Sequence, residues 1–274
     1  MLRTRVLTAI VLLIGFLASL FFLPWTIFAI LVAVFFAVGA WEWANLAGVG
    51  SHFYRLTYMF FLVGFAGLLG WVTEWTDNEE LFKAILIAAC SWWALCLLWI
   101  QGYPTSVLVW GSRPVRLMMG MFVLVPAWLS CLYLRQQSYG TWLVFMLVLV
   151  VAAADIGAYF TGRAFGKCKL AVRVSPGKSW EGVWGGAVFA LFVGSGYSLL
   201  MGQSDWLMAL IIIAPAALVS VVGDLLESMV KRHRGVKDSS QLLPGHGGVL
   251  DRIDGLVAAA PVFALAVLAT HWQL

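Results

Sequence analysis

The sequence predicts an all-α polytopic membrane protein with about nine transmembrane helices and a cytoplasmic N-terminus. Three observations support this fold class. The chain of 274 residues is 62% hydrophobic and only 11% charged, whereas a soluble domain is about half apolar and about a quarter charged. Its apolar residues are gathered into long runs, and most of its basic residues fall between those runs on one side of the expected membrane.

A helix that crosses a membrane needs roughly 20 mostly apolar residues. Arg3 and Arg5 precede the first apolar run, as in a signal peptide, but no small-x-small cleavage site precedes Pro24, so we expect an uncleaved helix. Acidic residues separate the third run from the fourth, and Asp205 separates the seventh from the eighth. The nine runs cover approximately residues 6–23, 25–47, 56–75, 81–100, 115–134, 141–162, 180–201, 206–230 and 253–272.

The distribution of charge gives these helices an orientation. If the N-terminus is cytoplasmic and nine helices alternate, then of the 17 Lys and Arg residues only Lys83 and Arg135 fall outside. The acidic segment Glu74–Glu80 and Asp205 also fall outside. This bias follows the positive-inside rule, and one missed helix would destroy it. The asymmetry therefore supports both the orientation and the number of helices.

Composition also excludes some classes of function. The net charge of +4 is modest, so we expect no nucleic-acid partner. Cys90, Cys96, Cys131 and Cys168 lack C-x-x-C and zinc-finger spacing, which predicts free thiols and no zinc site. We expect one integral membrane domain, residues 1–274, in which 1–140 form N-terminal membrane helices and 141–274 carry the polar segments and the chemistry.

Three polar segments interrupt the apolar C-terminal half. In the first, Asp155 and Tyr159 are four residues apart and share a helix face. An ionisable residue inside a transmembrane segment is a candidate functional residue by default. The alternative is that Asp155 pairs with a structural Arg or Lys on another helix.

The second polar segment is residues 175–182, where Ser175, Pro176 and Gly177 predict a turn and a helix begins at about Trp180. The N–H groups at a helix start bind anions, and nearby Lys and Ser side chains add to this. We expect Ser175, Lys178 and Ser179 to bind phosphate, although the G-x-x-x-x-G-K spacing of a P-loop is absent. The alternative is an ordinary capped helix.

The third polar segment, residues 223–254, carries most of the charge. Asp224, Glu227, Ser228 and Lys231 share one helical stripe, and Asp251 and Asp254 lie three apart on the next helix. Carboxylate oxygens suit Mg²⁺, so we predict a metal site at Asp224, Asp251 and Asp254. The alternative is a set of snorkelling charges and ion pairs. Glu42, in the second run, receives no assignment. The expected phosphate-binding residues here are Lys231, Arg232, Lys237, His246, Gly247 and Gly248, with Glu227, Ser228 and Arg252 in support.

These residues resemble a known signature. Ser228-x-x-Lys231-Arg232, Lys237-Asp238, Leu243-Pro244-x-His246-Gly247-Gly248 and Asp251-Arg252-x-Asp254 look like the pattern of the phosphatidate cytidylyltransferases. The resemblance covers roughly residues 150–255. It implies that CTP and phosphatidic acid give CDP-diacylglycerol and pyrophosphate. It also implies Mg²⁺, a second cation such as K⁺, a homodimer, and catalytic roles for Asp224, Lys231 and Asp251.

Three other functions remain as alternatives. Asp251-x-x-Asp254-Gly255 resembles the start of the CDP-alcohol phosphatidyltransferase motif, but no Asp follows Gly255. A CTP-dependent lipid kinase would use similar parts on an alcohol. A transporter of anionic solutes would show internal repeats and midplane charges, and neither is visible. We expect the protein in a bacterial inner membrane, with its site facing the cytoplasm.

Overall fold

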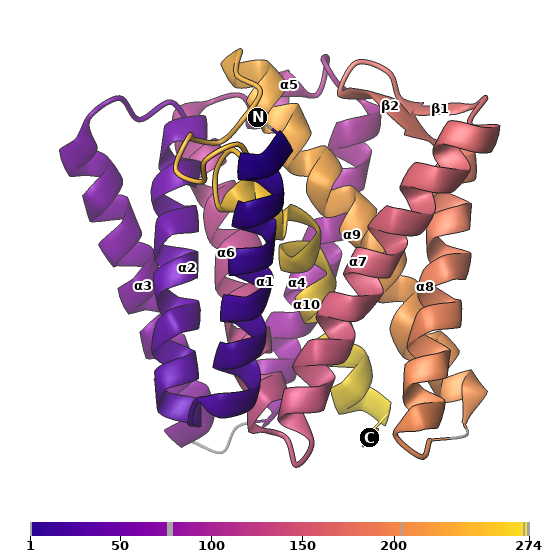
Figure 1. Ribbon diagram of the computed structural model, residues 1–274. Coiled ribbons are helices and arrows are strands. Elements are labelled where there is room, and N and C mark those ends of the chain that lie inside the picture. The colour runs from indigo at the N-terminus through magenta and orange to yellow at the C-terminus, as the bar shows by residue number, and fades with distance from the viewer. Residues whose placement is uncertain (1, 76–78, 204, 271, 273–274) are drawn as a thin grey trace.

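The protein folds as a bundle of long helices with one small hairpin. The computed structural model describes residues 2–75, 79–203, 205–270 and 272. Figure 1 shows the long helices running roughly side by side, with the hairpin at one end of the bundle, which we call the hairpin end. The helices are α1 (Leu2–Phe22), α2 (Trp25–Leu46), α3 (His52–Trp75), α4 (Glu79–Gln101), α5 (Val107–Trp110), α6 (Arg113–Gln136), α7 (Gly140–Phe165), α8 (Trp180–Leu200), α9 (Trp206–Arg234) and α10 (Leu250–Thr270).

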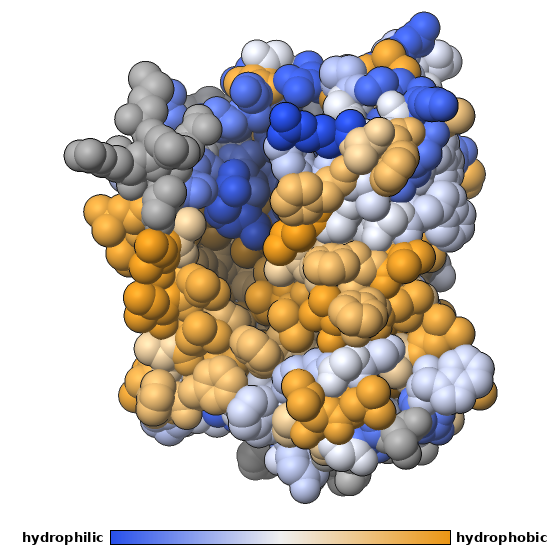
Figure 2. All heavy atoms as spheres, turned by 45° about the vertical axis from the view of Figure 1, so that its right-hand side comes forward, coloured by the Kyte–Doolittle hydropathy of each residue, from blue (hydrophilic) through white to orange (hydrophobic). Residues whose placement is uncertain are grey.

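Eight of these helices, α2–α4 and α6–α10, are long and apolar enough to cross a membrane. The apolar segment of α1, Leu7–Phe22, is shorter than those of the other long helices. Figure 2 shows an apolar band on the surface of the bundle and hydrophilic side chains gathered at the hairpin end. The prediction of a polytopic helical membrane protein is confirmed.

One short segment of the chain is not helical. Residues 169–179 form an antiparallel pair, β1 (Lys169–Ala171) and β2 (Ser175–Ser179), in which Lys169 pairs with Ser179 and Ala171 with Ser175. The expected turn at Ser175–Gly177 is therefore part of a strand. This segment lies between two transmembrane helices, so its backbone groups need partners of their own, which the strand pairing supplies.

Helix boundaries follow local sequence signals. Pro24 separates α1 from α2. The Asp205 side chain accepts hydrogen bonds from the backbone N–H groups of Leu207 and Met208, which caps the start of α9. Gly235, with φ of 75°, ends α9 in the left-handed conformation that glycine adopts without strain. α9 and α10 extend beyond the predicted apolar runs because their charged end turns remain helical.

The core of the bundle is centred on α10. This helix packs against α9, α6, α4 and α7, and Figure 1 shows it behind α1 in the middle of the molecule. Ala258, Phe263 and Ala264 in α10 are fully buried. Because α7 and α9 end at the hairpin end and α8 and α10 begin there, the polar segments of the C-terminal half meet at one end of the bundle.

Candidate active site

A cavity of about 500 Å³ lies at the hairpin end, between α7, the hairpin, the start of α8 and α9. Figure 2 shows hydrophilic side chains recessed in a hollow near this end, bordered by apolar surface. The cavity brings together predicted residues from all three polar segments. They are Asp155, Tyr159, Ser175, Lys178, Ser179 and Asp224.

Close packing of α7 against α8 shapes one wall of this cavity. A Cβ atom on Gly157 would lie 2.7 Å from the Cβ of Phe189, and one on Gly186 would lie 2.5 Å from the backbone oxygen of Ala154. Small residues allow helix backbones to approach closely inside a membrane. The glycines therefore set the distance between the helix that carries Asp155 and the helix that begins after Ser179.

An ion pair connects the hairpin to α9 inside the cavity. The Nζ atom of Lys178 lies 2.7 Å from Oδ2 of Asp224, and both side chains are partly exposed. The Ser228 hydroxyl donates a hydrogen bond of 3.1 Å to Oδ1 of Asp224. The predicted helical stripe on α9 is thus present, and the carboxyl group of Asp224 lies next to the partly exposed Lys178.

Ser179 has a structural contact as well as a place in the cavity wall. Its side chain is buried and accepts a hydrogen bond of 3.2 Å from the backbone N–H of Gly182. This is the N-cap contact of α8. The hydroxyl proton remains able to donate to a ligand in the cavity.

A second polar network lies around Lys231, which is only 9% exposed. Its Nζ atom lies 2.6 Å from Oδ1 of Asp251 and 3.2 Å from Oε1 of Glu227. The other oxygen of Asp251 accepts hydrogen bonds from the Ser239 backbone N–H, the Ser239 hydroxyl and the Gly248 N–H, at 2.9, 2.9 and 2.8 Å. Asp251 therefore fixes both the lysine and the loop before α10.

The two glycines of the loop are required by this network. A Cβ on Gly247, whose φ is 80°, would lie 2.6 Å from Oδ2 of Asp251. A Cβ on Gly248 would lie 2.0 Å from the hydroxyl oxygen of Ser239. The Gly248 N–H, which we predicted as a phosphate donor, binds Asp251 instead.

The three predicted metal ligands do not form one cluster. Asp254 is close enough to Asp224, Lys231 and Lys178 to interact electrostatically with them, and its Oδ1 accepts a hydrogen bond from the N–H of Gly255. Asp251 pairs with Lys231, and Glu227 interacts electrostatically with both Asp251 and Asp254. Within the described residues, no three His, Cys, Asp or Glu side chains are arranged to hold a metal ion.

Most of the remaining predicted residues do not line the cavity. Arg232 donates from Nε to the backbone oxygen of Val174, at 3.3 Å, and so supports the hairpin. Lys237 and Arg252 are exposed, and the buried Nδ1 of His246 has no hydrogen-bond partner among the described residues. Tyr159 accepts a hydrogen bond of 3.1 Å from Arg163. Tyr159 and Arg163 line the cavity that contains Lys178 and Asp224, whereas Arg232, Lys237, His246 and Arg252 are not among its lining residues.

Sequence reasoning left Glu42 unassigned, and the structure places it at the centre of the loop. This residue of α2 is 0% exposed. Its carboxylate accepts hydrogen bonds from the backbone N–H groups of Val249 and Leu250, at 3.0 and 2.8 Å, and from the hydroxyls of Ser239 and Ser240, at 3.2 and 2.5 Å. The signal that could have found it is the rule that ionisable residues in transmembrane segments are functional candidates.

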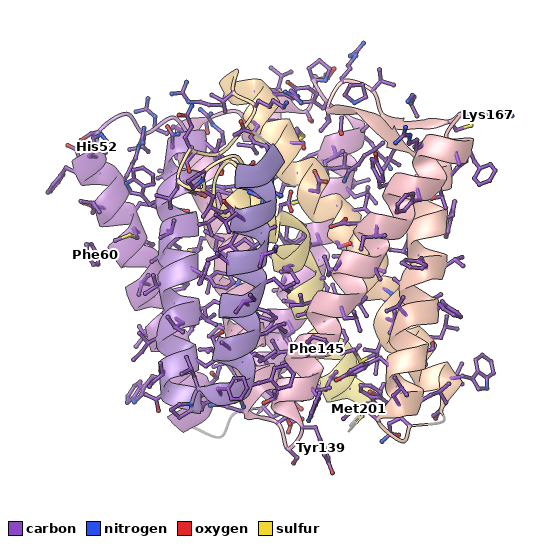
Figure 3. The ribbon with its side chains drawn as sticks, in the orientation of Figure 1. His52, Phe60, Tyr139, Phe145, Lys167 and Met201 are labelled. Carbon is purple, nitrogen blue, oxygen red and sulfur yellow. The ribbon has the colours of Figure 1, made fainter. Side chains whose placement is uncertain are left out.

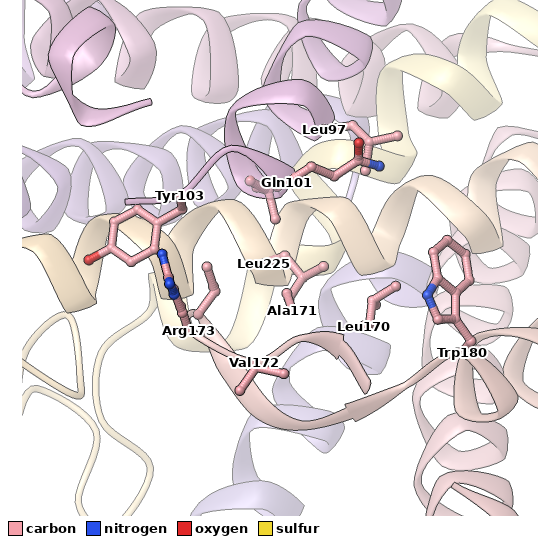
Figure 4. A pocket seen from close by; sticks show the side chains of 11 residues that line it. Leu97, Gln101, Tyr103, Leu170, Ala171, Val172, Arg173, Trp180 and Leu225 are labelled. Atoms are coloured by element: carbon pink, nitrogen blue, oxygen red, sulfur yellow. The ribbon is translucent and has the colours of Figure 1, made fainter. Parts of the chain in front are cut away.

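A second cavity lies on the other side of the hairpin. It has a volume of about 410 Å³ and is lined by the end of α4, residues 170–174 and Leu225 of α9. Figure 4 shows that its labelled side chains are mostly apolar, with Arg173, Gln101 and Tyr103 as the polar exceptions. It contains no carboxylate, so it does not offer the chemistry of the first cavity.

All four cysteines are free, as predicted from their spacing. Cys96 is buried within α4, and Cys168 is exposed beside the hairpin.

Comparison with known proteins gives full-length matches. A sequence model of the cytidylyltransferase family matches residues 3–270. The phosphatidate cytidylyltransferase of Pseudomonas aeruginosa is 46% identical over 274 residues, covering 99% of both chains. That of Haemophilus influenzae is 41% identical, covering 96% of this chain and 98% of its own. That of Brucella suis is 38% identical, covering 96% and 92%.

Proposed function

The chain belongs to the cytidylyltransferase family, and we propose that it transfers the cytidylyl group of CTP to phosphatidic acid, giving CDP-diacylglycerol and pyrophosphate. The observation that carries this proposal is the full-length identity to a phosphatidate cytidylyltransferase. The cavity supports it, because it places Lys178 and Asp224 together at the polar end of a membrane protein. This is where a water-soluble nucleotide and a lipid headgroup can meet.

The reaction needs charge neutralisation more than a strong base. A phosphate monoester has a second pKa near 6, so phosphatidic acid is largely dianionic at neutral pH and is already nucleophilic. A new bond forms between a lipid phosphate oxygen and the α-phosphorus of CTP, and the bond from that phosphorus to the β-phosphate oxygen breaks. The difficulty is the repulsion between two polyanions, which positioned cations reduce.

Lys178 and Lys231 are the cations best placed for this task. Lys178 lies on a strand, is partly exposed and is held by Asp224. Its ammonium group can therefore exchange the Asp224 carboxylate for a phosphate oxygen with little rearrangement of the side chain. Lys231 is buried and held by Asp251 and Glu227. We assign Lys178 and Ser175 to phosphate binding in the cavity, and Asp251 to the orientation of Lys231.

We also propose that Mg²⁺ takes part, held by Asp224 and Asp254. Mg²⁺ is usually bound by one or two carboxylates together with substrate phosphates and water, and these two residues interact electrostatically beside Lys178. When bound, the ion neutralises triphosphate charge and aligns the leaving group. Asp251 is less suited to bind Mg²⁺, because its oxygens already accept hydrogen bonds from Lys231, Ser239 and Gly248. We assign a second cation such as K⁺ to Glu227, whose Oε1 lies 3.2 Å from Lys231 Nζ and whose Oε2 has no hydrogen-bond partner among the described residues.

Orientation and assembly are part of the proposal. This integral membrane protein has eight transmembrane helices by length and composition, and we count α1 as the ninth. We place the hairpin end in the cytoplasm of a bacterial inner membrane, because basic residues favour the cytoplasmic side. The two basic residues expected outside are Lys83, near the start of α4, and Arg135, in the last turn of α6, and both of these helix ends lie opposite the hairpin end. Residues 141–274 form the catalytic part, and the homodimer follows from family resemblance alone.

Transfer of label from CTP tests the reaction. The purified protein is incubated with phosphatidic acid and CTP labelled at the α-phosphate, with and without Mg²⁺. We expect label in chloroform-extractable lipid that depends on phosphatidic acid and Mg²⁺, with equal release of pyrophosphate. Lipid labelled only from the γ-phosphate, in the presence of an alcohol, would instead identify a kinase. No transfer in either assay would contradict the proposal.

A further inference from the structure

Four arginines converge on the end of α2, outside the cavity described above. We call Arg55 of α3, Arg113 and Arg116 of α6 and Arg234 of α9 the arginine cluster. None of them lines the catalytic cavity. They come from three helices that are distant in sequence, so the fold itself brings them together.

Three members of the cluster bind backbone or amide oxygens near the end of α2. Arg55 donates from Nε to the oxygen of Val49, at 2.6 Å, and from Nη2 to Oδ1 of Asn45, at 2.7 Å. Arg116 donates from Nη1 to the oxygen of Leu46, at 3.2 Å, and Arg234 from Nε to that of Asn45, at 3.3 Å. These contacts hold the guanidinium groups in fixed positions.

The charge of the cluster is not neutralised. The ion pairs among the described residues involve Lys178 and Lys231, and no carboxylate pairs with a cluster arginine. Arg234 is close enough to repel Arg55 and Arg116, and Arg113 repels Arg116. The end of a helix supplies only about half a negative charge, which is far less than four positive charges require.

Other features fit a site prepared for an anion. Arg55 lies over the Trp41 ring, with 5.5 Å between its Cζ and the ring centroid. The Nε atom of Arg116 is buried without a hydrogen-bond partner among the described residues, and a buried unpaired donor is costly. A Cβ on Gly48 would lie 3.4 Å from Nη2 of Arg116 and 3.9 Å from Nε of Arg113, so both guanidiniums border this glycine.

We propose that the arginine cluster binds a phosphate-bearing anion at a site separate from the catalytic cavity. The planar guanidinium fork matches the geometry of phosphate oxygens, and the hairpin end is where lipid headgroups and soluble phosphates are both available. Phosphate oxygens of this kind are present both in the headgroup of an anionic phospholipid and in free pyrophosphate. The positive-inside rule alone would explain why basic residues lie in loops on one side of the membrane. It would not explain why four arginines converge on the end of α2, or why Nε of Arg116 is unpaired among the described residues.

The site is connected to the loop that precedes α10. The side-chain amide of Asn45 donates to the oxygen of Ser239, at 3.4 Å, and Ser239 in turn binds both Glu42 and Asp251. Arg234 lies three residues after Lys231 on α9. An anion on the cluster would therefore stabilise the arrangement of the loop that holds Asp251.

Hydrogen exchange read peptide by peptide tests the proposal. The full-length protein is placed in phosphatidylcholine nanodiscs, and either inorganic pyrophosphate is titrated or phosphatidylglycerol is included in the bilayer. We expect added protection in peptides that cover residues 44–55. Peptides that cover residues 175–183 report separately on the catalytic cavity.

A double variant, Arg113→Gln with Arg234→Gln, removes the two exposed charges. Because charge-assisted contacts to phosphate are strong, we expect the half-saturating concentration for protection of residues 44–55 to rise about tenfold. The matched control is Lys167→Gln with Lys169→Gln, which removes two exposed charges at the same end. Figure 3 labels Lys167 on the opposite side from His52, which lies at the start of α3 near the cluster. The control should leave this protection unchanged.

The results separate the two sources of phosphate. Protection by phosphatidylglycerol alone identifies a lipid headgroup site, and protection by pyrophosphate alone identifies a site for soluble phosphates. Absence of protection in residues 44–55 with both ligands would overturn the proposal, as would equal protection in the wild type and the arginine variant. A thermal melt without ligand checks folding. If the double variant is unfolded, Arg234→Gln alone takes its place, since its one contact is long.

Discussion

At the residue scale, acidic side chains in this protein divide into two kinds. Asp224 is partly exposed in the cavity and pairs with Lys178, which is also partly exposed. Glu42 and Asp251 instead accept several hydrogen bonds each from one loop. The first kind suits chemistry with a ligand, and the second kind fixes the shape of the site.

Replacing Asp224 with Asn should remove turnover while the protein still folds. The change keeps the side-chain shape but removes the charge that positions Lys178 and supports the proposed Mg²⁺. Loss of one electrostatic contact that acts in the transition state costs about a hundredfold or more in kcat. Steady-state assay of the purified variant measures this. Glu80→Gln, an exposed acid at the opposite end, is the control, and equal activity in both variants would contradict the assignment.

Replacing Glu42 with Gln should lower both stability and activity. The side-chain amide of Gln has one acceptor oxygen in place of two, so one of the backbone N–H groups of Val249 and Leu250 would lose its acceptor. Each buried group left unpaired costs about 1–3 kcal/mol. Thermal unfolding in detergent and kcat measured on the same preparation test this. Glu42→Asp, which keeps the charge, should recover part of the activity. No difference in activity between the Gln and Asp variants would exclude a role for the charge.

At the element scale, the contact between α7 and α8 decides the width of the cavity. Gly157 and Gly186 leave no room for a methyl group at their contact, and α8 begins directly after the strand that carries Lys178. A change in this helix pair therefore moves the walls that hold Asp155 and Lys178.

Gly186→Ala should destabilise the protein and reduce its activity. The new Cβ would lie 2.5 Å from the backbone oxygen of Ala154, so the helices must separate. Overpacking of this kind costs about 1–3 kcal/mol. Gly196→Ala is a matched control in the same helix, because no atom lies within 4 Å of its added Cβ. If the two variants unfold at the same temperature, the close contact is not important.

At the scale of the whole molecule, antiparallel helices gather residues that are far apart in sequence. Asp155, Lys178 and Asp224 reach one cavity because α7 and α9 both end at the hairpin end, next to strand β2. Glu42, from the N-terminal half, reaches the loop before α10 by the same arrangement. The N-terminal half therefore contributes a buried side chain to the loop before α10.

The orientation can be tested with the exposed thiol of Cys168 at the hairpin end. A membrane-impermeant thiol reagent should label it in inverted vesicles but not in intact cells stripped of their outer membrane. Tyr139 lies at the opposite end (Figure 3) and is 47% exposed. Tyr139→Cys in a Cys168→Ser background should give the reverse pattern. Labelling of Cys168 from outside would contradict the proposed topology.

The sequence by itself determined the class of fold, most of the helices and the chemical character of the site. Long apolar runs must be helical in a membrane, since each backbone group needs a partner within its own segment. The helical spacing of Asp224, Glu227, Ser228 and Lys231 predicted one shared stripe, and in the structure Ser228 contacts Asp224 and Lys231 contacts Glu227. The motif around Asp251 and Asp254 was enough to predict the family that the full-length matches show.

Only the tertiary structure decided which of these residues act together. Periodicity places a side chain on a helix face, but it does not say which other face lies opposite. For that reason the sequence grouped Asp251 with Asp224, whereas packing places it with Lys231, Ser239 and Gly248. The hairpin at residues 169–179 and the burial of Glu42 also depend on contacts between distant segments. Such contacts arise only when the helices pack, so local pattern does not encode them.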